Sequence, residues 1–134
     1  MINKRFFSDF VLILFDSFII LFCIIAVFGL IYGVQPCTVS GLSMAPTLDD
    51  GDLLISVPIK HDSLKDGDIV IIDVKDTYID SDYIIKRYYK NDDNTFNCYG
   101  DNEKASFDSR FFGELDNDRI KRKCILNLNK GKFY

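Results

Sequence analysis

The feature that most restricts the fold of this chain is an apolar segment near its amino terminus. The segment runs from Phe10 to Val34 and contains one charged residue, Asp16. A helix rises about 1.5 Å per residue, so roughly 20 apolar residues cross the hydrocarbon core of a bilayer. Asp16 would lie near the membrane interface, where a carboxylate costs less than at the centre. The sequence therefore predicts a transmembrane helix over residues 10–34.

A cleaved signal peptide is the alternative interpretation of this segment. Signal peptides have an apolar core of about 7–15 residues, followed by a small-x-small cleavage site. The run here is longer, and residues 29–36 contain no such site. We therefore expect a retained anchor behind a short polar lead, residues 1–9. Lys4 and Arg5 favour a cytoplasmic amino terminus, which leaves residues 35–134 outside the cytoplasm.

The net charge and the spacing of the cysteines argue against two kinds of function, nucleic-acid binding and zinc binding. The net charge of -4 argues against a nucleic-acid partner. Cys23 lies within the apolar segment, and Cys37, Cys98 and Cys124 are isolated without C-x-x-C spacing, so no zinc site is expected. These three cysteines allow either one disulfide with one free thiol or three free thiols.

The pattern after residue 34 changes from helical to strand-like, with turns containing Gly and Asp between apolar runs. Strands are expected over residues 53–57, 69–74, 83–89, 95–99 and 120–128, and a loop over residues 100–113. No convincing soluble helix interrupts them. The sequence therefore predicts a mainly β protein, with one transmembrane helix followed by a small antiparallel β-domain over residues 35–134.

Ser43 is the candidate nucleophile. It lies in a turn bounded by Gly41 and Pro46, where backbone N–H groups can point at a substrate. Peptide hydrolysis by a serine also requires a base and donors for the oxyanion. The only histidine, His61, lies in a polar turn and gives a Ser-His-Asp triad little support.

Lys86 is the alternative base. A lysine must be neutral to accept a proton, and burial in apolar surroundings lowers its pKa. Lys86 follows Ile84 and Ile85 and precedes Tyr88 by two positions, so apolar neighbours can remove its water. A lysine in a strand is, taken alone, more often a solvated residue. The motifs around Lys86 favour the catalytic interpretation.

Four motifs resemble, in order, those of the type I signal peptidases, which use a serine/lysine dyad. They are Ser-Met-Ala-Pro-Thr-Leu (43–48), Lys-Asp-Gly-Asp-Ile-Val (65–70), Tyr-Ile-Ile-Lys-Arg (83–87), and Gly-Asp-Asn followed by Ser-x-Asp-Ser-Arg within 100–113. One motif alone would be weak, but four in order behind an anchor are specific. Residues 88–99 replace a Gly-Leu-Pro-Gly-Asp stretch and a large inserted β-domain, so the chain resembles a minimal bacterial-type member.

The resemblance implies a role for each matching residue. Ser43 would attack the scissile carbonyl, Lys86 would be the general base, and Ser106 would hydrogen-bond the lysine amine. Gly41 stands where some members carry a hydroxyl in the oxyanion hole, so the oxyanion would rely on the Ser43 amide and other backbone donors. Bracing ion pairs would join the remaining matches, Arg87 with Asp101 and Arg110 with Asp108.

The resemblance also implies a substrate class. Members accept small side chains, typically Ala-x-Ala, in shallow pockets from an extended peptide that pairs with a strand edge. Met44, Ile55 and Val57 are candidates for lining these pockets, with core packing as the alternative. Ser43 follows the anchor closely and is expected near the outer membrane surface, where the apolar helix of a signal peptide ends.

The sequence therefore predicts a single-pass serine endopeptidase of the cell membrane that removes signal peptides from exported preproteins. Its partners would be those signal peptides and the lipid bilayer, with no metal or organic cofactor. A specialised peptidase for a restricted set, such as pilin-like or conjugation proteins, and a non-catalytic signal-peptide-binding module are the alternatives. Self-cleaving repressors share the serine/lysine chemistry, but the anchor and the lack of a DNA-binding segment argue against one. The oligomeric state is open.

Overall fold

The computed structural model describes residues 4–60, 63–75, 79–92 and 94–134. His61, weighed above as a base, lies outside these described residues. The chain divides into two compact units, of which the first ends at Gly33 and the second runs from Val34 to Tyr134.

The first unit is a single helix, α1 (Lys4–Tyr32). It starts before the predicted span and ends two residues short of it, where Gly33 adopts a φ of 61° and its amide bonds to the Leu30 carbonyl. Glycine takes this left-handed conformation readily, which is why helices so often stop at one. Ser17 donates to the Ile13 carbonyl at 2.8 Å, so its hydroxyl is satisfied within the helix.

Apolar side chains cover every side of α1, and the exposed exceptions are Ser8, Asp9, Asp16 and Ser17. From Phe7 to Tyr32 every side chain is exposed, apart from the half-buried Gly29. Among the described residues, α1 is the one helix that is long and apolar enough to cross a membrane. A helix that is apolar on every side requires an apolar environment, and no protein core covers this one.

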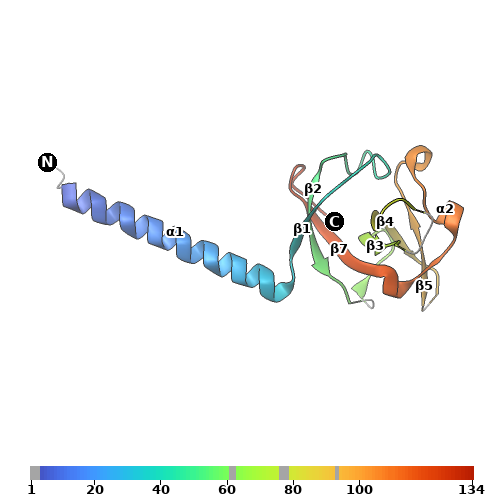
Figure 1. Cartoon of the computed structure of the whole chain (residues 1–134), viewed down its shortest axis with the longest axis horizontal. Helices are drawn as coiled ribbons and strands as arrows, with labels where there is room; N and C mark the ends of the chain where they lie inside the picture. Colours follow the sequence, from blue (N-terminus) through green and yellow to red (C-terminus); the bar gives the residue numbers. More distant parts are fainter. Residues whose placement is uncertain (1–3, 61–62, 76–78, 93) are drawn as a thin grey trace. The chain divides into compact units, whose positions relative to one another are not determined.

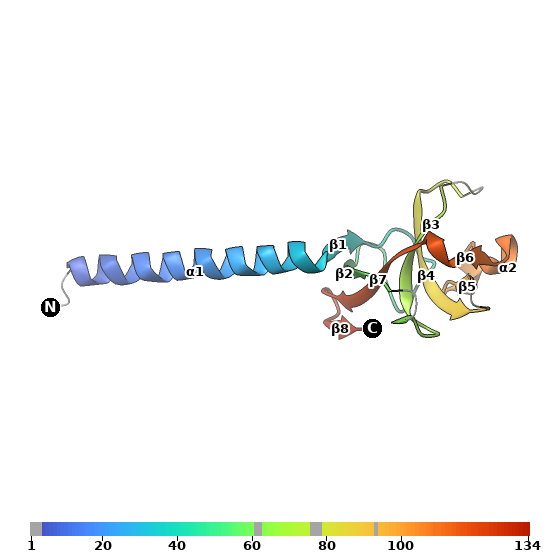
Figure 2. The same cartoon turned by 90° about the horizontal axis from the view of Figure 1, so that it is seen from below.

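The second unit is one curled antiparallel sheet, in which the described residues form eight strands in the order β1-β2-β7-β3-β4-β5-β6, with β8 paired to β7 (Figures 1 and 2). The strands are β1 (Gln35–Thr38), β2 (Leu53–Pro58), β3 (Ile69–Asp73), β4 (Tyr83–Lys90), β5 (Thr95–Tyr99), β6 (Leu115–Asp116), β7 (Ile120–Asn127) and β8 (Lys132–Phe133). The predicted mainly β, antiparallel fold behind an apolar helix is confirmed.

The sequence missed the short elements. β1, β6 and β8 are two to four residues long, too short for an alternating pattern to be visible. The predicted loop over 100–113 contains two short helices, η2 (Glu103–Ala105) and α2 (Ser109–Phe112), and a third, η3 (Asn117–Arg119), precedes β7. Asp108 caps α2 by accepting from the Arg110 amide, a local interaction that a four-residue helix needs.

The core forms two clusters of buried side chains on either side of β3. Ile69 belongs to the cluster with Met44 and Cys124, whereas Val70 and Ile72 belong to the other cluster. Successive strand residues point to opposite faces, so β3 is apolar from Ile69 to Ile72 because both of its faces are covered. Because β3 is packed on both faces, its pairing with β4 holds that strand, which carries Lys86, in place.

Candidate active site

Ser43 lies in the segment between β1 and β2, and that segment is held in place on both sides. Its neighbour Met44 is 1% exposed and packs in the core, and the Leu48 amide bonds to the Met44 carbonyl at 2.9 Å. From the other side, the Asn102 amide donates to the Ser43 carbonyl at 2.9 Å. The serine is thus fixed by its backbone, while its side chain stays partly exposed.

Gly41 adopts a φ of 90°, in the region that favours glycine. Its amide donates to the Asp50 carboxylate at 2.7 Å. This amide is therefore engaged in bracing the turn. The Ser43 amide, by contrast, has no acceptor within the described part of the chain.

Lys86 lies in the middle of β4, opposite Val70 of β3, and is only 4% exposed. Burial lowers the pKa of Lys86 below its ordinary value, and the Arg110 guanidinium acts in the same direction, whereas Asp108 and Cys98 oppose the shift. Within the described residues, the amine has no hydrogen-bond or ion-pair partner that would hold its proton. The desolvation expected from the sequence is present.

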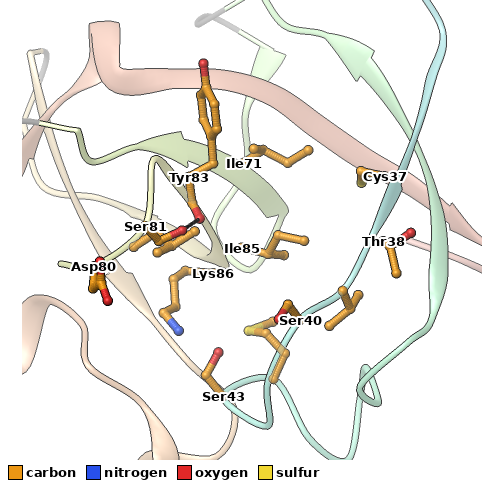
Figure 3. Close-up of a pocket in the computed structure, with 13 residues that line it drawn as sticks. Cys37, Thr38, Ser40, Ser43, Ile71, Asp80, Ser81, Tyr83, Ile85 and Lys86 are labelled. Atoms are coloured by element: carbon orange, nitrogen blue, oxygen red, sulfur yellow. Dashed lines mark hydrogen bonds between the residues drawn. The ribbon is translucent and has the colours of Figure 1, made fainter.

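Ser43 and Lys86 line the same cavity, which has a volume of about 450 Å³. Their side chains extend toward one another, the lysine from β4 and the serine from its turn (Figure 3). No hydrogen bond joins them among the interactions of the described residues. Catalytic hydrogen bonds are often loose in a free enzyme and tighten once substrate is bound.

Asp108 is fully buried and accepts hydrogen bonds from several donors. Ser106 donates at 2.5 Å, the Gly100 amide at 2.9 Å and Arg110 at 2.6 Å. Burial alone would raise the pKa of Asp108, but these donors hold it well below the ordinary value. The expected pair with Arg110 is therefore present.

Ser106 differs from the expectation. It was expected to hydrogen-bond the Lys86 amine, but no such bond occurs in the part of the chain that the structure describes, and its hydroxyl donates to Asp108 instead. The physical reason is that an ionised carboxylate is a stronger acceptor than a neutral amine. Ser106 is 6% exposed, in the same buried network as Asp108.

Gly100 allows the Ser43 turn and the Ser106 loop to meet. A Cβ at this position would lie 2.3 Å from the Ser106 hydroxyl oxygen and 2.5 Å from the Ser43 carbonyl oxygen. Such distances are shorter than any packed contact, so a side chain here would force the two segments apart. Gly100 opens the fourth sequence motif, and the motif by itself indicates no role for this glycine.

Arg87 points to the opposite face of β4 from Lys86. Its guanidinium donates to both oxygens of Asp101, at 2.7 and 2.8 Å. The second expected ion pair is therefore also present. It is a two-pronged pair between partly buried side chains, 24% and 17% exposed.

The three candidate residues for substrate binding differ in whether they line the cavity. Met44 lines the cavity, but Ile55 and Val57 do not. They alternate with buried Leu54 and Ser56 on β2, so they point to the other face of that strand. The lining instead comes from β1 and its extension, from β3, and from the segment entering β4: Cys37, Thr38, Val39, Ser40, Ile71, Asp80, Ser81, Tyr83, Ile84 and Ile85.

A protein-family model matches this chain. The family described as signal peptidase, peptidase S26, matches residues 12–89, more than half of the chain. The matched region includes most of the apolar helix, Ser43 and Lys86, and ends before the Gly100 motif. A search of curated proteins finds no match. The match indicates a function of the signal-peptidase type, and with the apolar helix it indicates a membrane-anchored protein. The chain belongs to the signal peptidase family, peptidase S26.

Proposed function

We propose that this protein is a membrane-anchored serine endopeptidase that removes signal peptides from exported preproteins with a Ser43/Lys86 dyad. The observation that carries the proposal is a buried lysine, with a lowered pKa, whose amine faces a serine across a cavity. A buried amine with no carboxylate partner is costly for stability, and such groups gather at functional sites.

The chemistry follows from the two side chains. Neutral Lys86 accepts the proton of the Ser43 hydroxyl as the oxygen attacks the scissile carbonyl, which gives an acyl ester. The resulting ammonium gives that proton to the departing amine. Lys86, neutral again, then takes a proton from the water that attacks the ester. It returns this proton to the Ser43 oxygen as the ester bond breaks and the acyl group leaves with a new carboxyl end. The free Ser43 amide supports the proposal as one donor for the oxyanion.

The cavity lining supports an extended peptide as substrate. β1 is at the end of the strand order, with β2 as its one partner in the described sheet, so its other edge is available for pairing. Thr38, the last residue of β1, and Val39, which follows it, line the cavity. A peptide added along that edge would place alternate side chains in the cavity, as expected for small residues at Ala-x-Ala sites.

The anchor is part of the proposal. We assign α1 as a single-pass anchor in the cell membrane, with Lys4 and Arg5 on the cytoplasmic side and residues 35–134 outside. This arrangement would present the catalytic unit on the side of the membrane where signal peptides emerge.

The test uses the full-length chain in detergent or vesicles, with a secretory preprotein as substrate. We expect cleavage after an Ala-x-Ala sequence, identified by mass spectrometry of the new amino terminus, and no cleavage by Ser43→Ala. The Ser40→Ala protein is the matched control, because Ser40 is a nearby serine of the cavity lining. Cleavage that persists in Ser43→Ala would reject the dyad, whereas absence of cleavage by the parent protein would favour a binding module.

A further inference from the structure

Two thiols that the proposed reaction does not use meet in the cavity wall. Cys37 on β1 is half-buried and lines the cavity, and Cys124 on β7 is fully buried. β2 lies between these strands, and its residue Ser56 is the register partner of Cys124. Cys37 packs against the buried cluster that contains Cys124. Both cysteines are free thiols.

The groups facing Cys37 favour its thiolate. Hydrogen bonding from Cys124 lowers the pKa of Cys37 to about 7, helped by Ser56 and by the charge of Arg122, while burial opposes the shift. Arg122 is held in place, because its guanidinium donates to the Ser56 hydroxyl and to the Ser56 carbonyl, each at 2.9 Å. The interaction with Cys37, together with burial, raises the pKa of Cys124. Cys124 therefore keeps its proton and acts as the donor to Cys37.

We propose that Cys37 is a covalent modification site for low-molecular-weight disulfides, and that its modification closes the cavity to peptides. The Cys37 thiolate attacks one sulfur of the reagent, so a new sulfur–sulfur bond forms, the reagent's own bond breaks, and half of the reagent leaves as a thiolate. No other oxidant is needed, and excess thiol reverses the step. The closure rests on the proposed function, whereas the modification does not.

The other thiols of the second unit are protected. Burial raises the pKa of Cys98 to about 11, and Cys98 is fully buried. Cys124 is buried and protonated. Since the thiolate is the reactive form, Cys37 should react far ahead of both. Cys37 lines the same cavity as Thr38 and Val39, so a group added to its sulfur would take up space proposed for the peptide.

The first test is labelling of the full-length chain with dithionitrobenzoate, a disulfide that releases a coloured thiolate. Cys23, which is exposed on α1, is first replaced by alanine to remove background. We expect one thiol per chain to react fast, at a rate that rises with pH around a midpoint of about 7. The remaining thiols should react only after unfolding. A fast phase that survives Cys37→Ala would overturn the proposal.

Cys124 provides a matched pair of variants. Cys124→Ala removes the donor, so the midpoint for Cys37 should move toward the ordinary cysteine value of about 8.5. Cys124→Ser keeps a hydroxyl donor and should retain a midpoint closer to that of the parent. Should the alanine variant fail to fold, the labelling profiles of the serine variant and of the parent protein test whether Cys37 has the lowered pKa. A parent midpoint at the ordinary value contradicts the assignment.

The proposed closure of the cavity by the group added to Cys37 is tested by separate measurements. The labelled protein should lose cleavage of a signal-peptide substrate and recover it when dithiothreitol is added. In the Ser43→Ala protein, a saturating Ala-x-Ala peptide should slow the labelling of Cys37, independent of any turnover. Undiminished cleavage after labelling, or labelling unaffected by bound peptide, would reject the closure. If the unlabelled protein cleaves nothing, the peptidase proposal fails, while the labelling still decides the modification site.

Discussion

Arg87 and Asp101 form a two-pronged ion pair that ties the four sequence motifs together. Besides both oxygens of Asp101, the Arg87 guanidinium reaches the Gly67 carbonyl at 2.8 Å and the Thr47 hydroxyl at 3.3 Å. These contacts involve one residue from each motif. Arg87 thereby holds the Ser43 turn and the Gly100 loop to β4, the strand that carries Lys86.

Replacing Asp101 by asparagine should therefore destabilise the folded unit. The change removes the charge that balances a partly buried guanidinium, at a cost of about 2 kcal/mol. Chemical denaturation of the full-length chain followed by circular dichroism measures the free energy of unfolding. Asp82→Asn is the control, because Asp82 and Lys75 form an exposed pair at 4.0 Å and the change should have little effect. Equal effects of the two variants would contradict the bracing role.

Replacing Lys86 by methionine should abolish activity and stabilise the fold. Loss of a general base costs about 10²–10⁴-fold in rate. Because burial lowers the pKa of Lys86, the unfolded chain binds more protons, and folding stability should rise with pH up to the ordinary lysine value. Methionine removes that cost, so the gain over the parent should be larger at neutral than at alkaline pH. A Lys86→Met protein less stable than its parent at neutral pH would contradict the burial cost.

The activity of the parent should rise with pH, with a midpoint below the ordinary lysine pKa, because only the neutral amine accepts the proton. Asp108 favours the charged form of Lys86, so Asp108→Asn should move this midpoint to lower pH. The pH profile of peptide cleavage measures both. Asp66→Asn, a change to an exposed carboxylate that bonds the Lys90 amide, should leave the midpoint in place.

Asp108→Asn should also change stability in acid. The depressed pKa of Asp108 contributes stability that is present above its unfolded pKa of about 3.9 and is lost as the pH falls below that value. The variant should be about 2–3 kcal/mol less stable at neutral pH, because a buried acceptor of several hydrogen bonds loses its charge. Its deficit should shrink below about pH 4. Unfolding midpoints measured across this range check the sign.

Gly100→Ala should reduce activity and stability together. The added Cβ would overlap Ser106 and the Ser43 carbonyl, and overpacking of this kind costs about 1–3 kcal/mol. Gly29→Ala is the control, because a Cβ there meets nothing within 4 Å. A second variant combines Gly100→Ala with Ser106→Gly, which removes part of the overlap and should recover part of the stability. An unaffected Gly100→Ala protein would show that the two segments separate freely.

Much of the fold could be read from local patterns. The five predicted strands match β2, β3, β4, β5 and β7 to within one or two residues, because apolar alternation and the Gly and Asp turns are local signals. β1 has no such pattern, and its conformation depends on pairing with β2. The two expected ion pairs could also be anticipated, because the motifs carry both partners of each.

The sequence by itself determined the apolar helix, the mainly β unit, and the presence of a serine and a lysine suited to one another. Tertiary structure alone decided which face of each strand meets the cavity, so Ile55 and Val57 point away while Cys37 lines it. It also decided that Ser106 donates to Asp108, and that Cys37 meets Cys124 across β2. The physical reason is that alternation defines two faces of a strand, whereas only the long-range pairing of β1, β2 and β7 selects what each face contacts.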